Sequence, residues 1–390
     1  MRFVGIDIGS DRHVVAAVNL DGKVVLKPST FTEDAAGHSR LIKALGLASE
    51  CLVAMEATGS YWQNIFVSLE EAGFKVALVN PIRTNRFAQS DLARTKTDAL
   101  DAIGIARFAQ QKRPEPTRLP DEATRTLRDL VRLRERVVQD IGDSVRRLHR
   151  LVHLGFPEFK QYVRTLESEL ATSVLTAFPS ASAYEGATKQ LAELVYDGRR
   201  VVGLERAKKL VAAARVSVGK HHGEGHRTQV LYACEDLCRG RSRLRELDAR
   251  IEELLHRHEV GRLLLSIDGV REQTAARLVS EIGDFKRFGS ANKLAAYVGC
   301  IPALKHSGKS RPSAQMSHLG NARLRHALWM PILALVRKNA WLGAYYRRLV
   351  AGGKKHKVAM VASMRKFLHA VYSIALSRKP FVLKQQESES

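Results

Sequence analysis

Cysteines, long apolar runs and C-terminal acidic residues are all scarce in this chain of 390 residues. Its four cysteines, Cys51, Cys234, Cys238 and Cys300, are too few and too scattered for a disulfide framework, which fits a reducing compartment. No stretch reaches the roughly eighteen consecutive apolar residues of a membrane-spanning helix. The first residues also lack the basic segment followed by an apolar one that marks a signal peptide, so we expect a cytoplasmic protein.

The scarcity of acidic residues is greatest at the C-terminal end. Residues 311–390 carry 15 Lys and Arg but only 2 Asp and Glu, whereas residues 1–80 carry 7 and 9. The whole chain has a formal net charge of +23 and a pI of about 10.1. Because clustered Lys and Arg displace counterions from phosphates, this charge predicts a nucleic-acid partner. With 45% hydrophobic residues, the chain can also form two or three folded domains.

The first domain, residues 1–112, alternates between strand and helix patterns. Apolar segments at 3–9, 13–20 and 23–31 predict three strands in a meander, because the Asp-Gly pair at 21–22 is typical of a hairpin turn. Helical spacing and strand-like runs then alternate as far as residue 80. This order of elements predicts a mixed α/β sheet. Three prolines within residues 112–123 indicate a linker after it.

The middle region, residues 113–260, is predicted to contain two long helices. A seven-residue apolar spacing predicts a coiled-coil seam along the first helix, formed by Leu127, Val131, Val138, Ile141, Val145, Leu148 and Val152. Arg134 interrupts this seam. The same spacing recurs within residues 226–258, at Val230, Leu237, Leu244 and Ile251. The two helices can pair within one chain or between chains.

The last region, residues 261–390, is predicted to be mainly helical. Residues 264–288 have the pattern of a helix, a tight glycine turn and a second helix. This is typical either of a helix-hairpin-helix unit, whose backbone amides bind phosphate, or of a plain helical hairpin. A polar, basic segment follows, and residues 354–375 predict a basic amphipathic helix.

Four acidic residues have an unusual setting. Asp7 lies within an apolar strand and Glu56 ends another, where a carboxylate is costly unless a donor or a metal compensates it. Asp98 and Asp101 are three apart on a predicted helix, so they share a face and repel each other. Such a pair also occurs on ordinary solvated helices that neighbouring cations neutralise. The nearby cations, which are candidate nucleic-acid contacts, are Arg83, Arg86, Arg94 and Lys96. Together, four converging carboxylates can hold two ions of Mg²⁺ or Mn²⁺ about 4 Å apart and polarise a phosphate.

The sequence resembles a known family, the insertion-sequence transposases with an Asp-Glu-Asp-Asp tetrad. The matching stretches are "GIDIGSDRHVVAAV", "MEATGSYW", "KTDALDA", "IDGV", "DFKRFGSANKLAAYVG", "HSGKSR" and "GNARLRHAL". The resemblance implies a RuvC-like ribonuclease-H fold for residues 1–112, with the four acids as metal ligands. It also implies a DNA recombinase that is guided by a structured bridge RNA, acts as a homodimer or homotetramer and lies near the bacterial nucleoid.

The same resemblance implies a catalytic serine in the C-terminal transposase domain. The family's motif is commonly Ser-Ser-Gly, and here "HSGKS" places Ser307 before the glycine, with His306 in place of the first serine. A serine that attacks a phosphodiester needs cations to spread the developing charge. The candidate cations and nucleic-acid contacts in this region are Lys305, Lys309, Arg311, Arg323 and Arg325.

Other functions remain compatible with these patterns. One is a RuvC-like junction-resolving nuclease that uses metal-activated water, and another is a non-catalytic nucleic-acid-binding protein. The first strand also resembles the phosphate loop of actin-like sugar kinases, but the sequence shows neither their second Asp-Gly loop nor their Gly-rich adenosine site.

Overall fold

The structure is a computed structural model that describes residues 1–90, 97–305, 313–316 and 319–383. Contacts between residues divide the chain into two units, Met1–Leu119 and Pro120–Ser390. The division falls within the proline-containing segment that was predicted to be a linker. Residues 120–390 form one unit by this measure, and a separate domain boundary near residue 260 stays a prediction. The two units are described one after the other.

The first unit is built on a five-stranded mixed sheet. Its strands are β1 (Arg2–Asp7), β2 (Arg12–Val18), β3 (Val24–Thr32), β4 (Cys51–Glu56) and β5 (Lys75–Val79). They lie in the order β3-β2-β1-β4-β5, with β1 to β3 antiparallel and β1, β4 and β5 parallel. The predicted meander and mixed α/β sheet are therefore confirmed.

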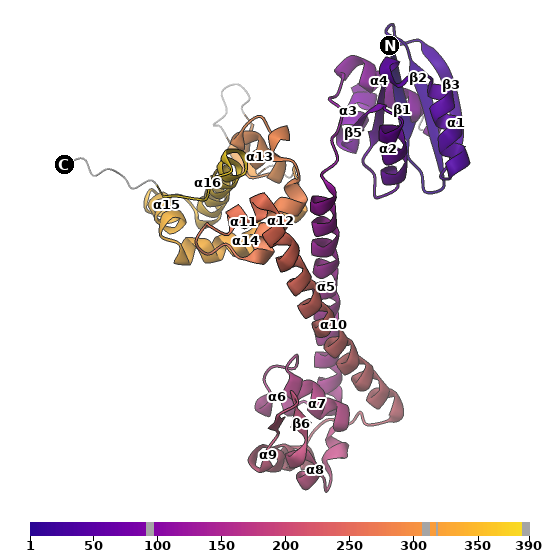
Figure 1. Cartoon of the computed structure of the whole chain (residues 1–390). Coiled ribbons are helices and arrows are strands. Elements are labelled where there is room, and N and C mark those ends of the chain that lie inside the picture. Colours follow the sequence, from indigo (N-terminus) through magenta and orange to yellow (C-terminus); the bar gives the residue numbers. More distant parts are fainter. Residues whose placement is uncertain (91–96, 306–312, 317–318, 384–390) are drawn as a thin grey trace, which may run out of the picture. The chain divides into compact units, whose positions relative to one another are not determined.

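Helices cover both faces of this sheet (Figure 1). On one face, Val4 and Ile6 of β1 share a core with α1 (Ala35–Leu45) and α2 (Trp62–Glu71). On the other, Phe3 shares a core with α4 (Asp98–Lys112), and Phe87 of α3 (Pro81–Ser90) packs against it. Because successive side chains of a strand point to opposite faces, this division fixes which residues of β1 and β4 face α4.

The second unit contains two long helices side by side, α5 (Glu122–Gly155) and α10 (Glu224–Arg257). Leu127 at the start of α5 shares a core with Leu255 at the end of α10. Leu148 near the end of α5 shares a second core with Val230 at the start of α10. The helices are thus antiparallel and pair within one chain.

The segment between these helices forms a small lobe of short elements around the second core. They are α6 (Phe159–Tyr162), α7 (Glu169–Ala177), α8 (Thr188–Glu193), β6 (Val195–Tyr196), β7 (Arg200–Val201) and α9 (Leu204–Arg215). Tyr184 is fully buried there between Phe156 and Phe178. Short helices thus make up most of this lobe.

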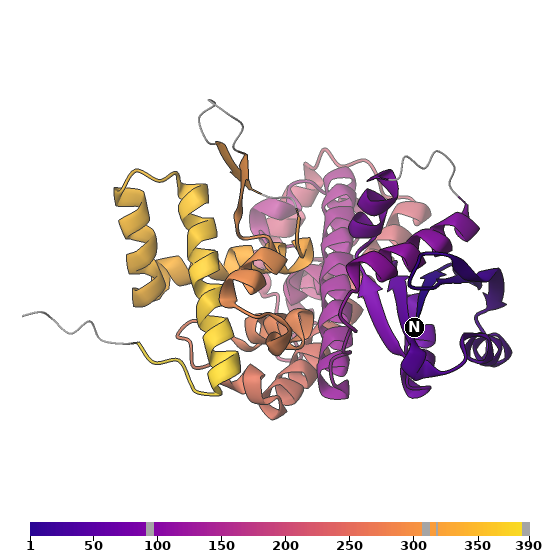
Figure 2. The same ribbon diagram turned by 90° about the horizontal axis from the view of Figure 1, so that it is seen from above.

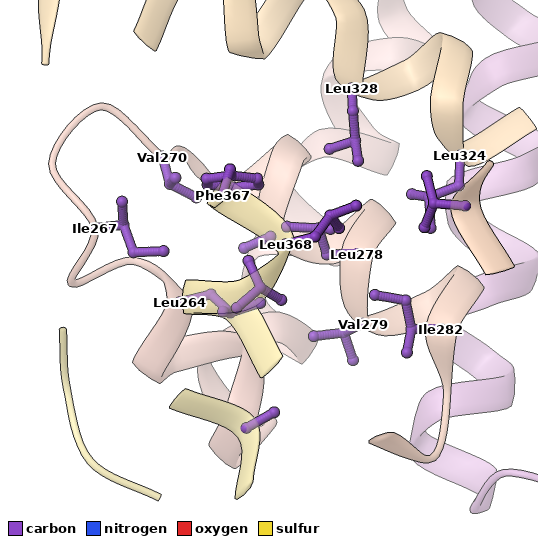
Figure 3. Packing of buried hydrophobic residues seen from close by; sticks show 14 of the residues in the cluster. Leu264, Ile267, Val270, Leu278, Val279, Ile282, Leu324, Leu328, Phe367 and Leu368 are labelled. Carbon is purple, nitrogen blue, oxygen red and sulfur yellow. The ribbon is translucent and has the colours of Figure 1, made fainter. Parts of the chain in front are cut away.

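The C-terminal part of the second unit is mainly helical, as predicted, with one two-stranded sheet. Its elements are α11 (Glu259–Leu264), α12 (Glu272–Ile282), α13 (Ala291–Val298), β8 (Pro302–Lys305), β9 (Ser313–Met316), α14 (Ala322–Lys338), α15 (Ala340–Ala351) and α16 (His356–Ser377). Helices α13 to α16 lie together in both views of the chain (Figures 1 and 2). Figure 3 shows Leu278, Leu328 and Phe367 meeting in their shared core.

An ion pair between a half-exposed arginine and a buried glutamate joins α5 to these C-terminal helices. Arg132 of α5 donates from Nε to Oε1 of Glu281 in α12 at 2.9 Å, and the Asn321 amide donates to Oε2 at 3.4 Å. Burial acts to raise the pKa of Glu281, but the hydrogen bond and charge of Arg132 outweigh it and lower that pKa. Because Asn321 also caps α14, this one carboxylate orients three elements.

The predicted seam along α5 is wrong at Val138. That side chain is 41% exposed, and its neighbour Val137 is buried instead. Arg134, which interrupts the apolar series, donates to Asp248 of α10 at 2.5 Å. In the described part of the chain, no helix is long and apolar enough to cross a membrane.

Candidate active site

Two of the four acids lie at the carboxyl ends of neighbouring parallel strands. The register between β1 and β4 pairs Ile6 with Met55, so the next residues along the two strands are Asp7 and Glu56. Adjacent strands are about 4.8 Å apart, which places these two residues next to each other. Asp7 is four residues after Phe3 on β1, so both side chains point to the same face of the sheet. Glu56 pairs with Val79 of β5. Both Phe3 and Val79 belong to the core under α4. Both acids therefore point to the face that α4 covers.

Helix α4 crosses this face in the direction opposite to β1. A Cβ on Gly5 would lie 2.1 Å from the carbonyl oxygen of Ala102 and 2.3 Å from the amide nitrogen of Ala106, so the helix rests directly on the strand. At the far end, the Arg113 guanidinium lies over the Phe3 ring, 6.0 Å from its centroid. Since the end of α4 meets the beginning of β1, the beginning of α4 must lie at the end of β1.

The other two acids occupy that first turn of α4. Asp98 begins the helix, and Asp101 follows three residues later in the same turn, at the end of the sheet where Asp7 and Glu56 emerge. Thr97 caps the helix by accepting a hydrogen bond from the Leu100 amide. Negative side chains are favoured at a helix N-terminus, which offsets part of the repulsion between the two. The structure thus brings all four candidate acids to one end of the first unit.

Their exposure differs in a way that suits a shared site. Asp98 is exposed, whereas Asp7, Glu56 and Asp101 are half-buried. A site at this corner is therefore open on the side of α4's first turn and closed toward the sheet. Such an arrangement lets a phosphate approach from solvent while the carboxylates stay fixed from behind.

A fifth residue, which the sequence analysis missed, holds one of the acids. The Thr84 hydroxyl lies 2.5 Å from Oε1 of Glu56 and 2.9 Å from the carbonyl oxygen of Pro81. Thr84 is only 6% exposed, and a buried hydroxyl that donates to a carboxylate restricts its rotation. No pattern in the sequence indicated this contact, because Thr84 lies on a helix 28 residues after Glu56.

The side chains fit hard divalent cations by kind, because all four offer only carboxylate oxygens. Among the described residues, one group of three possible metal ligands has its ligand atoms within 4.8 Å of one another, namely Glu252, His256 and Glu272. None of the four acids belongs to this group. That group lies on α10 and α12, and two of its members are exposed.

Two of the four candidate cations near the tetrad, Arg83 and Arg86, are among the described residues. Arg83 of α3 is exposed and lies over the Phe108 ring of α4, 5.3 Å from its centroid. Arg86 on the same helix is exposed. Arg94 and Lys96 lie outside the described residues. Arg83 and Arg86 therefore lie on a helix that packs on the same face of the sheet as α4, the face toward which the acids point.

Most candidate residues around the serine motif lie outside the described residues, namely Ser307, Lys309 and Arg311. Strands β8 and β9 bracket this segment, and Lys305 ends β8. The sequence analysis did not predict this hairpin. It returns the chain to the start of α14, so the segment with Ser307 is a connection between two paired strands.

The remaining two candidates lie on α14. Arg323 is exposed, and one of its nitrogens lies 3.9 Å from Oε2 of Glu135 on α5. Arg325 is half-buried and donates to the carbonyl oxygen of Val298 at 3.1 Å. Both arginines belong to the second unit, whereas the tetrad belongs to the first.

Comparisons with known proteins find similarity in both units of the chain. Residues 4–157 match the model of the DEDD transposase family of the IS110 type, and residues 261–347 match that of the IS116/IS110/IS902 transposase family. The insertion element IS110 uncharacterized 43.6 kDa protein of Streptomyces coelicolor is 25% identical, over 95% of this chain and 93% of its own. The pilin gene-inverting protein of Moraxella bovis is 24% identical, over 97% of each chain. Among solved structures, Thermus thermophilus RuvC in complex with a Holliday junction substrate covers 30% of this chain and 99% of its own, with 18% identity and a TM-score of 0.24.

Proposed function

This chain belongs to the DEDD family of insertion-sequence transposases, and we propose that Asp7, Glu56, Asp98 and Asp101 form its metal-dependent centre for cutting DNA strands. The observation that carries the proposal is the meeting of two strand ends with the first turn of α4. Gly5 beneath Ala102 sets the height of the helix above the strand, and the register of β1 and β4 sets the spacing of the first two acids.

Divalent ions, Mg²⁺ or Mn²⁺, would polarise the scissile phosphate and lower the barrier to attack. The protein's own part is to hold the ligands. Glu56 is kept in one orientation by the Thr84 hydroxyl, and Asp98 and Asp101 are presented by a capped helix that rests on the sheet. Exposed Arg83 and Arg86, from the helix next to α4, provide positive charge for the DNA backbone.

We further propose that Ser307, in the segment between β8 and β9, is the attacking nucleophile. Its Oγ would form a bond to phosphorus while one phosphorus–oxygen bond to deoxyribose breaks and the departing oxygen takes a proton. A hydroxyl of another strand can then reverse this step, so strands are rejoined without ATP. This order of events requires the tetrad and the serine to act on the same phosphate.

A structured RNA would select the DNA sites by base pairing, leaving the protein mostly backbone contacts, as in other RNA-guided systems. Support comes from the family and from the net charge of +23. We propose a homodimer or homotetramer as the acting form, at the bacterial nucleoid. Purifying the full chain from cells that carry its gene with the flanking DNA, then sequencing the bound nucleic acid, identifies both DNA sites and guide.

The test of the metal centre compares Asp7→Asn and Asp101→Asn with Asp21→Asn, a control on the exposed turn between β2 and β3. We expect the two tetrad variants to bind DNA normally but to lose strand cleavage and to bind Mn²⁺ more weakly in calorimetry. The control should behave like the original chain. Full cleavage by Asp7→Asn would refute the proposal.

The nucleophile is tested separately by denaturing electrophoresis of protein–DNA mixtures. Ser307→Ala should remove a covalent adduct that Ser310→Ala, the neighbouring serine in the same segment, retains. Cleavage that proceeds without any adduct in the unaltered chain would instead favour metal-activated water as the nucleophile.

A further inference from the structure

The second unit contains a long stretch of sequence without carboxylates. Residues 285–386 contain 20 Lys and Arg and not one Asp or Glu. Two of these cations, Arg323 and Arg378, reach carboxylates that lie outside the stretch, Glu135 and Glu259. The surface of α13 to α16 therefore favours an anionic ligand over a cationic one.

A cavity of about 350 Å³ lies within this stretch, between α14 and α16. Its volume falls in the range of pockets that hold small organic ligands, roughly 300–1,000 Å³. It is lined by Cys300, Arg325, His326, Trp329, Val361 and Met364.

The floor of this cavity is apolar and uncharged. The Cys300 side chain is 1% exposed, and its Sγ lies 3.2 Å from Sδ of Met364. Burial raises the pKa of the Cys300 thiol to about 12, so the sulfur stays protonated near neutral pH. The half-buried Trp329 ring adds an aromatic surface. Sulfur atoms and an indole ring are favourable neighbours for a flat aromatic ligand.

The rim of the cavity is polar, and one of its groups is held in place. Arg325 donates to the Val298 carbonyl, and a Cβ on Gly299 would meet its Nη1 at 2.1 Å. Gly299 has φ +83°, a conformation that favours glycine, and its missing side chain leaves room for the guanidinium. His326, the next residue on α14, is exposed. The guanidinium and the imidazole suit a phosphate, and the indole suits a flat ring, so together they match a ring that is linked to a phosphate.

We propose that this cavity binds one unstacked nucleotide of a nucleic-acid strand, with its base against Trp329 and its phosphate toward Arg325 and His326. The inference rests on the proposed function, since it deepens how the chain holds its nucleic acid. Cys300 precedes β8 by two residues, so the nucleotide is held at the base of the β8–β9 hairpin. Taking one base out of the stack there would fix the register of the strand on the protein.

The experiment measures binding of single strands to the full chain in EDTA, where cleavage does not enter. The probes are fluorescent strands of about 15 nucleotides: oligo-dT, oligo-rU, and a deoxyribose-phosphate strand without bases. Stacking of one base on an aromatic side chain is worth about 5- to 150-fold in affinity. We expect a preference of that size for at least one base-containing strand over the abasic one, and the comparison of dT with rU shows whether DNA or RNA supplies the nucleotide.

The variant Val361→Phe fills the cavity and should abolish this preference without changing the affinity for the abasic strand. Val358→Phe is the matched control, because Val358 lies on the same helix and is 52% exposed. It should keep the preference. Equal affinity of the unaltered chain for strands with and without bases, or an unchanged preference in Val361→Phe, would overturn the proposal.

A second measurement does not depend on how well Val361→Phe folds. The chain has three tryptophans, so Trp62→Phe with Trp341→Phe leaves Trp329 as the sole reporter. Its emission should be quenched by the base-containing strand and not by the abasic strand. If neither strand changes the emission, the cavity does not take a base. Because EDTA is present throughout, this outcome is independent of whether the tetrad cuts DNA.

Discussion

Replacing Gly5 by alanine tests how closely α4 rests on the sheet. The added Cβ would lie 2.1 Å from the Ala102 carbonyl oxygen and 2.3 Å from the Ala106 amide nitrogen, and both atoms belong to the helix backbone. No side-chain rotation can relieve such a contact. The helix must move away from β1 by about 1 Å, and overpacking of this kind costs about 1–3 kcal/mol.

The same shift displaces the tetrad. Asp98 and Asp101 move with the helix, whereas Asp7 and Glu56 stay with the strands. A misplacement of about 1 Å at a reacting centre can lower the rate about 10²-fold. We therefore expect Gly5→Ala to lose far more strand cleavage than the change in stability alone explains, while DNA affinity stays unchanged.

A matched control lies on the helix itself. Gly104 of α4 has no atom within 4 Å of where its Cβ would be, so Gly104→Ala should stabilise the helix by about 0.5–1 kcal/mol. The free energy of unfolding in urea and hydrogen exchange of peptides from residues 98–112 measure the two opposite effects. If Gly5→Ala exchanges and cleaves like the original chain, α4 does not rest on β1 as described, and the reasoning about the tetrad fails with it.

Three more variants test single contacts. Thr84→Val should lower the cleavage rate with little change in DNA affinity, because Glu56 loses the hydroxyl at 2.5 Å that orients it; rate and affinity are measured on one substrate. Glu281→Ala should cost about 1.5–3 kcal/mol in the free energy of unfolding, since the hydrogen bonds from Arg132 and Asn321 to its carboxylate are lost, and Glu253→Ala on the exposed face of α10 should cost little. Glu33 accepts hydrogen bonds from His38, Asn64 and His13; burial acts to raise its pKa, but these bonds outweigh it and lower that pKa. The stability that ionised Glu33 provides is present above the ordinary carboxyl pKa and is lost as the pH falls through its lowered pKa. Glu33→Gln should therefore make the melting temperature depend less on pH in the acidic range.

The tetrad could be proposed from sequence because two of its members end apolar strands and the other two share one face of a helix. Asp7 and Glu56 follow runs of apolar residues that read as strands, and parallel neighbouring strands bring their carboxyl ends together. The glycine in the first strand also carried a signal, because glycine inside a strand often marks close approach of another backbone. The Thr84 contact had no such signal, since it depends on how α3 is turned after β5.

The seam along α5 shows where a repeat stops predicting burial. A helix of 3.6 residues per turn drifts by about 20° for each seven residues, so a strict heptad faces its partner only when the helices supercoil. Here the apolar cores lie at the two ends of the pair, around Leu127 and around Leu148. Between them, Gly240 of α10 meets Ile141 closely, with 2.7 Å from an added Cβ to Cγ1. Burial in that stretch is therefore decided by which residues the partner helix presents, and this is why Val137 is buried in place of Val138.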